Sequence, residues 1–295
     1  MNCFCTISTK SHLFKSKVLS DSLKKYGYQT INLVVDSDSV DEKTIFESKS
    51  YLTLKDLPQS DTKLILSKYR AHSDKLRWAL KPVLMKYLLE TKFEKVIYVD
   101  NDIYFFSKPN LLFDQLDLSN ILLTPHFYSF NPKKEQNWFE ANYRVGLFNA
   151  GFVGVNRKAI DMLNWWRECC EFNIKKSFWR GLFDDQKYLD LVPIVFDNVY
   201  IIKDTGYNLA GWNYKNRLLK LGETDFSSIT FVHFAELTLK EFSKIENPFH
   251  PLFNDYLTVM KTKGYLINQN DKKYSKRNIL AYFYFLLWKL ARKFD

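Results

Sequence analysis

The sequence predicts an α/β fold in which a mostly parallel central sheet is flanked by helices. In the first half of the chain, short apolar and β-branched runs alternate with segments whose apolar residues recur at helical spacing. The run Val96–Val99 has no polar group except a tyrosine hydroxyl, as expected of a strand covered on both faces. A chain of 295 residues is long enough for one large domain of this kind with an addition.

The elements expected in the first half follow from these patterns. Cys3–Ile7 and Thr30–Val35 are apolar and short, which favours strands. Phe14–Lys25 and Leu76–Leu89 have apolar residues at the spacing of a helix, and the second of them leads into the strand at Val96–Val99. This alternation is typical of a parallel sheet with helical crossovers.

The second half of the chain is less regular. Ile121–Leu123 predicts another short strand, and Ser129–Asn142 is polar enough for an exposed loop or lid. Phe148–Val155 is an apolar run with two glycines, and Ala159–Phe172 has helical spacing. We expect Ile194–Phe242 to consist of short strands and loops.

Composition narrows the classes of partner. The net charge of +10 and the pI near 9.2 favour an anionic partner, which is nucleotide phosphate, nucleic acid or anionic lipid. The cysteines lack metal-ligand spacing, and neighbours as close as Cys169 and Cys170 do not normally form a disulfide with each other. We therefore expect reduced core thiols in a cytoplasmic protein. The N-terminus does not resemble a signal peptide, and no stretch approaches the ~18 apolar residues of a membrane span.

The chain divides into a domain of residues 1–265 and a basic, aromatic appendage of residues 266–295. Within the appendage, the ten apolar residues Ile279–Trp288 follow a basic stretch and precede Lys289, Arg292 and Lys293. Ten residues do not cross a bilayer of ~30 Å as a helix. A short amphipathic helix with basic flanks suits an anionic membrane surface, so we expect a peripheral protein on the inner face of the cell membrane. Docking of this helix on the domain or on a second subunit is the alternative.

Two carboxylates follow the strand at Val96–Val99. Asp100 and Asp102 lie one residue apart at its carboxyl end, where α/β sheets bind their ligands. Both side chains can bind one hard divalent cation, and Mg²⁺ and Mn²⁺ take oxygen ligands while keeping positions for substrate phosphates. The tripeptide Asp100-Asn101-Asp102 therefore indicates a metal site. A solvated turn is the alternative, because the same residues suit a strand exit.

Further segments extend this pattern in order along residues 2–240. They are Trp78-Ala79-Leu80-Lys81-Pro82, Asp100-Asn101-Asp102, Leu123-Thr124-Pro125-His126, Phe148-Asn149-Ala150-Gly151-Phe152, Phe183-Asp184-Asp185-Gln186, Gly206-Tyr207-Asn208-Leu209-Ala210-Gly211-Trp212-Asn213 and Phe231-Val232-His233-Phe234. The ordered set resembles the GT-A class of nucleotide-sugar glycosyltransferases, and most closely the bacterial family 8-type enzymes of lipopolysaccharide and capsule assembly. The resemblance implies a Rossmann-like GT-A fold for a catalytic domain of residues 1–265.

The resemblance also implies a divalent cation, Mn²⁺ or Mg²⁺, bound by Asp100, Asp102 and His233. His233 follows the apolar strand Ile229–Val232, and a neutral imidazole suits Mn²⁺ better than Mg²⁺. The residues expected to bind the sugar-nucleotide donor around this cation are Thr6, Ile7, Ser8, Asp36, Arg77, Lys81, Asp100, Asn101, Asn149, Ala150, Gly151 and Lys240.

Several of these donor residues have alternative interpretations. Thr6–Ser8 and Asp36 end the first two strands, where they can face a base or ribose, but ordinary turn chemistry explains them equally well. Lys81 stands where the resembling enzymes often hold an arginine, and Arg77 lies four residues earlier on the same helical face. Either cation can instead be surface charge. Lys240 departs from the register of the family's lysine, because this chain lacks the glycine that usually follows the histidine.

The remaining candidates concern the sugars. Asn149-Ala150-Gly151 lets backbone approach a sugar while the amide donates hydrogen bonds. Asp185-Gln186 matches the family's Asp-Gln pair that contacts the transferred sugar, and an acidic helix N-terminus is the alternative. The expected catalytic residues are Asp184, Asp185 and Gln186. The residues expected to contact the acceptor are His126, Asn208 and Trp212.

These features predict metal-dependent transfer of a sugar from a nucleoside diphosphate sugar, by resemblance a UDP-sugar, to a hydroxyl of a glycan or lipid-linked acceptor in cell-surface polysaccharide assembly. Family 8-type enzymes retain configuration, and the metal-binding histidine favours that outcome. An inverting enzyme of the same fold would use Asp184 or Asp185 as base.

Other function classes fit less well. A sugar nucleotidyltransferase would carry a glycine-rich loop after the first strand, whereas Ser8-Thr9-Lys10-Ser11 has no glycine. A nucleic-acid-binding protein would interleave basic and aromatic residues, and the densest such cluster is the apolar tail, so we expect no nucleic-acid partner. The presence of both aspartates and His233 argues against a non-catalytic sugar binder.

Overall fold

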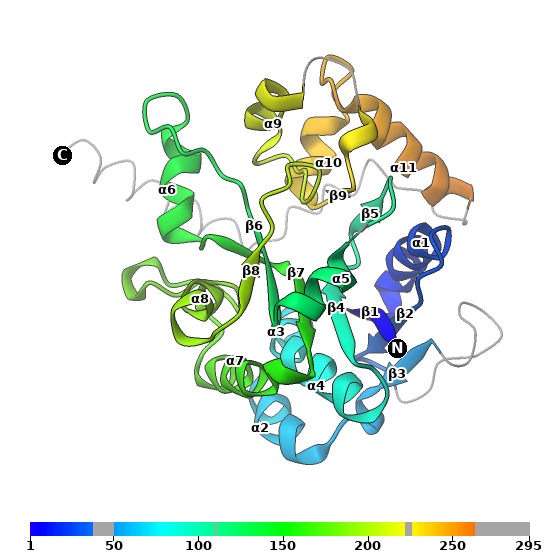
Figure 1. The fold of residues 1–295 in the computed structure, drawn as a ribbon, viewed down its shortest axis with the longest axis vertical. Helices are drawn as coiled ribbons and strands as arrows, with labels where there is room; N and C mark the ends of the chain where they lie inside the picture. The colour runs from blue at the N-terminus through cyan, green and yellow to red at the C-terminus, as the bar shows by residue number, and fades with distance from the viewer. Residues whose placement is uncertain (38–49, 110, 222–225, 263–295) are drawn as a thin grey trace.

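The computed structural model describes residues 1–37, 50–109, 111–221 and 226–262. A central sheet has the strand order β3-β2-β1-β4-β7-β6-β8 (Figure 1). Its strands are β1 (Asn2–Ser8), β2 (Thr30–Val34), β3 (Tyr51–Thr53), β4 (Lys95–Val99), β6 (Ile121–Pro125), β7 (Phe148–Asn156) and β8 (Val199–Ile201). β7 is antiparallel to both of its neighbours, and the other pairs are parallel. The expected α/β fold with a mostly parallel sheet is confirmed.

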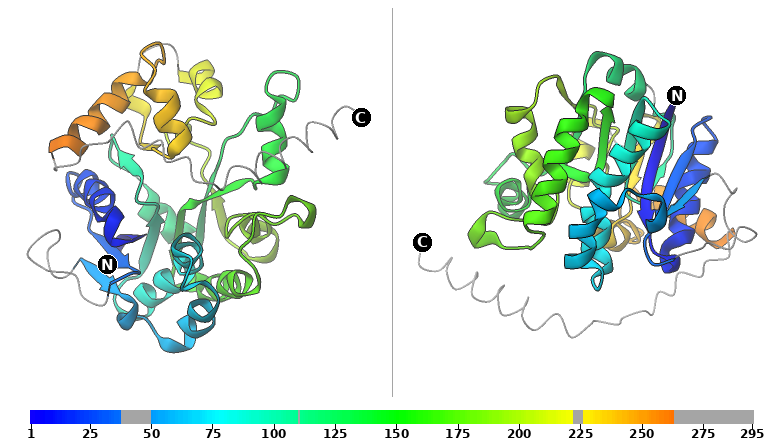
Figure 2. Two further views of the ribbon diagram at one scale, coloured as in Figure 1. Left: turned by 180° about the vertical axis from the view of Figure 1, so that it is seen from behind. Right: turned by 90° about the horizontal axis from the view of Figure 1, so that it is seen from below.

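Helices cover both faces of this sheet, as Figure 2 shows from behind and from below. The helices of the two layers are α1 (Leu13–Lys24), α2 (Gln59–Tyr69), α3 (Ser73–Ala79), α4 (Lys81–Thr91), α5 (Leu112–Leu118) and α7 (Ile160–Phe172). α2, α3, α4 and α7 bury their apolar residues on one face, and α1 and α5 bury theirs on the other.

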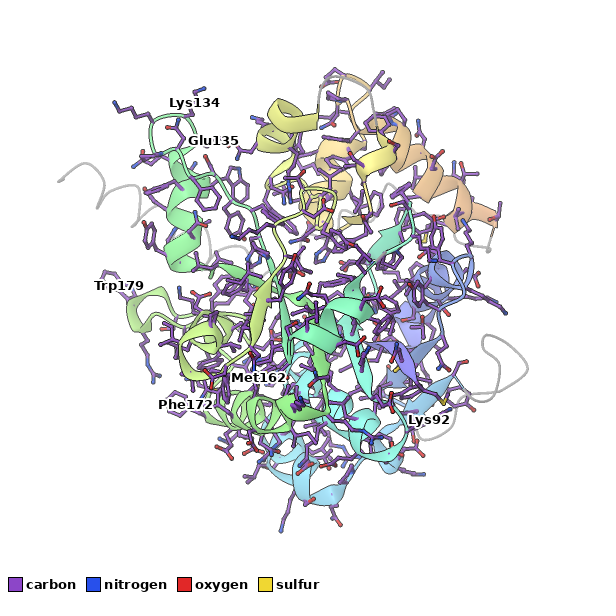
Figure 3. All side chains as sticks on the ribbon, in the orientation of Figure 1. Lys92, Lys134, Glu135, Met162, Phe172 and Trp179 are labelled. Atoms are coloured by element: carbon purple, nitrogen blue, oxygen red, sulfur yellow. The ribbon has the colours of Figure 1, made fainter. Side chains whose placement is uncertain are left out.

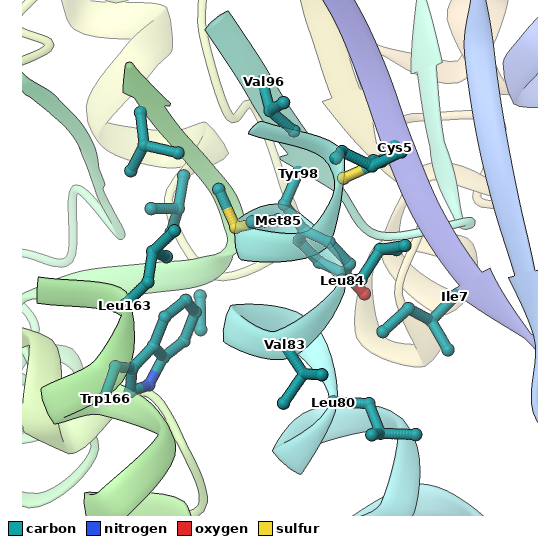
Figure 4. Close-up of a cluster of buried hydrophobic side chains, with 14 of the residues drawn as sticks. Cys5, Ile7, Leu80, Val83, Leu84, Met85, Val96, Tyr98, Leu163 and Trp166 are labelled. Carbon is teal, nitrogen blue, oxygen red and sulfur yellow. The ribbon is translucent and has the colours of Figure 1, made fainter. Parts of the chain in front are cut away.

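Alternate residues of each strand pack against the helices on opposite faces of the sheet. Cys3 and Cys5 pack with α4 and α7, whereas Phe4 between them packs with α1 and α5. Figure 4 shows the first of these layers, where Met85 of α4 and Trp166 of α7 meet the strands. Cys3, Cys5 and Cys170 are buried, Cys169 is half-buried, and all four are free thiols, as the sequence predicts.

A second, two-stranded sheet and several helices lie outside the central sheet. β5 (Ile103–Phe105) pairs antiparallel with β9 (Phe231–His233). The remaining helices are α6 (Gln136–Arg144), α8 (Val192–Val195), α9 (Tyr214–Leu221), α10 (Glu236–Phe242) and α11 (His250–Thr262). A separate aromatic core, which includes Phe234, Phe242 and Tyr256, joins α10 and α11 to β9.

Three expectations about secondary structure are wrong. The single helix expected over Leu76–Leu89 is two helices, because Pro82 is the second residue of α4 and lacks the N–H that would continue α3. The loop expected over Ser129–Asn142 contains most of α6, in which Gln136 and Asn137 are exposed and Asn142 is buried. The short strands and loops expected over Ile194–Phe242 include the helices α9 and α10. β4 is covered on both faces, but only its β1 edge is parallel.

Two other expectations concern membrane contact. Among the described residues, no helix is both long enough and apolar enough to span a membrane. The appendage expected at residues 266–295 and the boundary at residue 265 lie outside the described ranges, so both stay predictions.

Candidate active site

Asp100, Asp102 and His233 come together at the carboxyl end of β4. The turn Asp100-Asn101-Asp102 leads directly into β5, and β5 pairs with β9 in a register that sets Ile103 opposite His233. The backbone N–H of Phe234 also donates to the carbonyl of Asp102 at 2.7 Å. As a result, ligand atoms of the two carboxylates and the imidazole all lie within 4.8 Å of one another. One divalent cation can bind three groups at this spacing.

The imidazole of His233 is held on both of its nitrogen atoms. Nε2 lies 3.0 Å from Oδ1 of Asp102, and Nδ1 lies 3.1 Å from Nδ2 of Asn149. Burial opposes charge on both members of the pair, but their mutual attraction outweighs it, so the pKa of Asp102 is lowered and the pKa of His233 is raised. A cation that binds Nε2 must displace a proton from it, so metal binding is coupled to proton release.

Gly151 on β7 makes room for this cluster. A Cβ atom at this position would lie 2.6 Å from Oδ2 of Asp100 and 3.0 Å from Cε1 of His233. The backbone N–H of Gly151 donates to Oδ1 of Asn149 at 2.8 Å, which orients that amide. The two carboxylates, the imidazole and the space beside them therefore fit a divalent cation, such as Mg²⁺ or Mn²⁺.

Lys81 connects the metal cluster to the second acidic cluster. Its side chain is buried, and Nζ lies 3.1 Å from Oδ2 of Asp185, 3.6 Å from Oδ1 of Asp100 and 3.1 Å from the carbonyl of Ala150. Burial alone would lower the pKa of Lys81, but Asp100 and Asp185 outweigh it and the pKa is raised. Lys81, which is expected to bind the donor, therefore forms ion pairs with two carboxylates of the protein itself.

The acidic segment 184–186 lies on the far side of Lys81. Burial raises the pKa of Asp185 to about 6, and the charge of Lys81 limits the rise. Asp184 has a left-handed backbone with φ 49°, and its carboxylate pairs with Lys176 at 3.3 Å. Gln186 is half-buried, and its Nε2 donates to the carbonyl of Val145 at 3.4 Å. A residue with a left-handed backbone, such as Asp184, and a buried carboxylate with a raised pKa, such as that of Asp185, are typical of functional sites.

The expected acceptor residues form an amide network beside His233. Nδ2 of Asn149 donates to Oδ1 of Asn208 at 3.0 Å, and Nδ2 of Asn208 donates to the carbonyl of Pro125 at 2.9 Å. Nε1 of Trp212 donates to the carbonyl of His126 at 2.9 Å, and the Trp212 ring meets the His233 ring edge-on at 5.3 Å. Asn208 and His126 are both buried, whereas Trp212 is partly exposed.

His126 is expected to make the stability of the protein depend on pH. Burial and the nearby charge of His233 lower the pKa of His126 from 6.5 to about 3. The unfolded chain therefore binds a proton that the folded chain excludes, and stability is lost as the pH falls from 6.5 towards 3. We expect the His126 contribution to fall by about 2 kcal/mol between pH 7 and pH 5.

Urea unfolding at these two pH values measures this contribution. His126→Asn keeps a donor for the carbonyl of Gly146, which lies 3.1 Å from Nδ1, but removes the titrating group. The variant should lose less stability than the wild type on acidification, and His72→Asn, at an exposed histidine, should behave like the wild type. Equal losses in His126→Asn and wild type would contradict the assignment.

The expected nucleotide-binding residues lie at the neighbouring strand ends. Nδ2 of Asn101 donates to the carbonyl of Ile7 at 3.3 Å, which joins the metal turn to β1. Ser8 is buried and donates to Oδ1 of Asn32 at 3.1 Å, and the hydroxyl of Thr6 is also buried. Asp36 is exposed and accepts from the backbone N–H of Lys10 at 2.8 Å.

Within the described ranges, no hydrogen bond or ion pair joins either of the two other expected donor cations to the metal cluster. Arg77 on α3 is half-buried, and its Nη2 donates to Oδ1 of Asp74 at 2.6 Å. Lys240 is exposed on α10.

Tyr98 is a site residue that the sequence analysis did not identify. Its buried hydroxyl donates to Oδ1 of Asp100 at 2.9 Å, and its ring lies under Nζ of Lys81 at 5.1 Å. Its place beside Asp100 could have been predicted, because side chains two residues apart on a strand lie on the same face and Tyr98 precedes Asp100 by two residues. Lys176, which pairs with Asp184, carries no comparable signal in the sequence.

The chain matches no protein-family model. Two uncharacterized proteins of Bacillus subtilis (strain 168) align with most of it: YfnD is 28% identical over 260 residues, covering 81% of this chain and 80% of YfnD. YfnF is 25% identical over 255 residues, covering 82% of this chain and 84% of YfnF.

Among solved structures, the galactosyltransferase LgtC in complex with donor and acceptor sugar analogues superimposes with a TM-score of 0.53 at 13% identity, covering 91% of this chain and 98% of LgtC. The glycosyltransferase GlyE of Streptococcus pneumoniae TIGR4 superimposes with a TM-score of 0.51 at 13% identity, covering 88% of this chain and 62% of GlyE. The chain therefore has the GT-A fold that its sequence predicts.

Proposed function

We propose that this protein is a metal-dependent glycosyltransferase that moves a sugar from a nucleoside diphosphate sugar to a hydroxyl of a glycan or lipid-linked acceptor. The observation that carries the proposal is the convergence of Asp100, Asp102 and His233 at the carboxyl end of β4 in a GT-A fold. This edge of the sheet is where α/β folds bind nucleotides. Two carboxylates and one imidazole leave further positions on a cation for a diphosphate.

The residues of the chain divide into groups with separate tasks. A cation, when bound, would neutralise the charge that develops on the departing diphosphate. Lys81 holds Asp100 and Asp185 in fixed positions, since its buried ammonium group lies within ion-pair distance of both carboxylates. Asn149 and the backbone around Gly151 orient His233 and border the space where a donor sugar would lie.

The stereochemical course that we propose is retention. An inverting base must meet the acceptor hydroxyl directly. Asp185 is 3% exposed and its carboxylate is paired with Lys81, while Asp184 is paired with Lys176. Both carboxylates therefore suit positioning of the donor sugar and of Gln186 better than proton abstraction from an acceptor. Inversion with either aspartate as base is the alternative.

We further propose Mn²⁺ as the preferred cation and UDP as the nucleotide of the donor. The imidazole in the ligand set supports the first, because nitrogen ligands suit Mn²⁺ better than Mg²⁺. The net charge of +10 and the basic, aromatic residues 266–295 support work on a lipid-linked glycan at the cytoplasmic face of the cell membrane, in cell-surface polysaccharide assembly.

The proposal is tested by hydrolysis of a panel of nucleotide sugars with Mn²⁺, Mg²⁺ or chelator. We expect slow, metal-dependent release of one nucleoside diphosphate, and a loss of at least about 100-fold in Asp102→Asn and His233→Ala, because each removes a metal ligand. Asp114→Asn, a matched change at an exposed carboxylate on α5, should keep wild-type activity. Metal-independent release, or full activity in both ligand variants, would contradict the proposal.

A further inference from the structure

A cavity of about 160 Å³ lies between the start of α6 and the segment that carries α9 and α10. Its walls include Glu135, Trp138, Trp212, Tyr214 and Glu241. None of these residues except Trp212 belongs to the site described above. The cavity is smaller than the ~300–1,000 Å³ typical of pockets for drug-sized ligands, so it suits one ring and not an extended molecule.

Trp212 is the connection between this cavity and the metal cluster. Its indole lines the cavity and also meets the ring of His233 edge-on, with ring centroids 5.3 Å apart. Nε1 of Trp212 donates to the carbonyl of His126 at 2.9 Å, which fixes the orientation of the ring. A ligand in the cavity would therefore be separated by one indole from the imidazole of the metal cluster.

Trp138 provides a second aromatic wall that is held rigidly. It stacks on Tyr128 with ring centroids 5.5 Å apart, and Tyr128 stacks on His126 at 4.7 Å, with 8° between the planes in each pair. Tyr128 and His126 are buried, so the stack anchors Trp138 from inside the protein. A preorganised aromatic wall loses little conformational freedom when a ligand binds.

Two carboxylates at the edge of the cavity are also held in position. Oε2 of Glu135 accepts from Nδ2 of Asn216 at 2.9 Å, a contact that spans from the start of α6 to α9. Oε2 of Glu241 accepts from the hydroxyl of Tyr214 at 3.4 Å and from Nζ of Lys244 at 2.8 Å. Each carboxylate has further lone pairs, which can accept hydrogen bonds from hydroxyl groups.

The floor of the cavity depends on a glycine. A Cβ atom on Gly211 would lie 2.8 Å from the carbonyl of Leu237, so only glycine allows this loop to approach α10 so closely. The backbone N–H of Gly211 donates to Oγ1 of Thr238 at 2.9 Å. The cavity is thus built from three fixed segments that are distant in the sequence.

We propose that this cavity binds one uncharged pyranose ring of the acceptor glycan, next to the sugar that receives the transferred group. The C–H face of a pyranose packs on an aromatic ring, and its equatorial hydroxyls point outwards to polar groups at the rim. Trp138 and Trp212 provide the apolar walls, and Glu135 and Glu241 provide hydrogen-bond acceptors for those hydroxyls. This inference rests on the proposed glycosyltransferase function and names a binding position for its acceptor.

The test measures binding of methyl glycosides of glucose, galactose, N-acetylglucosamine and rhamnose by saturation-transfer NMR. We expect at least one glycoside to bind wild type and Trp138→Ala to weaken that binding at least about tenfold, equivalent to about 1.4 kcal/mol. Trp179→Ala is the control, because Trp179 is 94% exposed on the separate 3-10 helix Phe178–Arg180 (Figure 3). Glu135→Gln, which preserves shape, should weaken the same glycoside.

Nucleotide-sugar hydrolysis in the absence of acceptor separates this inference from the proposed function. Trp138→Ala and Glu135→Gln should hydrolyse the donor at the wild-type rate, which also shows that they fold. Equal glycoside binding in wild type and Trp138→Ala, or no glycoside bound by a wild type that hydrolyses a donor, would overturn the inference. Tryptophan-dependent glycoside binding by a wild type that hydrolyses no donor would support the cavity and contradict the proposed enzyme.

Discussion

Gly151→Ala is expected to abolish divalent-cation binding in a chain that still folds. The added methyl group would lie 2.6 Å from Oδ2 of Asp100, 2.9 Å from Oδ1 of Asn149 and 3.0 Å from Cε1 of His233. Asp100 has little freedom to move, because its other oxygen accepts from the hydroxyl of Tyr98 at 2.9 Å. The substitution therefore separates two metal ligands at once. We expect Mn²⁺ affinity to fall by about 100-fold. This is the upper end of the loss that is typical when a residue that positions the metal ligands is substituted.

Calorimetric titration with Mn²⁺ measures this effect, and Gly154→Ala provides its control. A Cβ atom on Gly154, on the same strand, would meet Leu122 at 3.0 Å and no residue of the metal cluster. Both alanines overpack β7, and each should cost about 1–3 kcal/mol of unfolding free energy. Loss of metal affinity in both variants, or in neither, would contradict the role of Gly151.

The two metal carboxylates were predictable from the sequence, but the geometry that brings His233 to them was not. Asp100 and Asp102 follow an apolar strand, so their place at the edge of the sheet is a local property. His233 reaches Asp102 because β5 pairs with β9, which lies more than a hundred residues later in the chain. No pattern in either short strand specifies this pairing, so only the resemblance to a family identified His233 as a ligand.

The contacts of Lys81 could not be predicted from the sequence for a different reason. The residue was identified as part of the site, but its neighbours in the structure are Asp185, Asp100 and the carbonyl of Ala150. Its place on a helix before β4 was predicted, although the one helix expected there is divided at Lys81 into α3 and α4. Whether a buried lysine faces a ligand or an aspartate depends on packing between α4 and β7, which sequence periodicity does not determine.

The cavity beside α6 was not predicted for a related reason. The polar residues of Ser129–Asn142 favour a loop, and the helix α6 forms because Trp138 stacks on Tyr128 and Glu135 contacts Asn216. The second of these contacts joins segments that are distant in the sequence, and neither follows from a local pattern. Local propensity is weak in such a segment, and tertiary packing decides its structure.

Lys81→Met is expected to destabilise the protein by about 3–5 kcal/mol at neutral pH, because it leaves a buried carboxylate without its cation. The loss should depend on pH. Burial already raises the pKa of Asp185 to about 6, so the folded protein holds this proton more tightly than the unfolded chain. The contribution of Asp185 to stability is therefore present at low pH and lost as the pH rises through about 6.

Without Lys81 the pKa of Asp185 must rise further, and a protonated Asp185 needs no cation. Urea unfolding of Lys81→Met should consequently show a smaller deficit at pH 5.5 than at pH 7.5. Lys86→Met on the same helix is the control, since Lys86 pairs with Asp61 at 3.0 Å where both side chains keep contact with water. Its loss should be smaller than that of Lys81→Met, because Lys86 and Asp61 are less buried than Lys81 and Asp185. A deficit in Lys81→Met that equals the control, or that does not change with pH, would mean that Asp185 is balanced by another group.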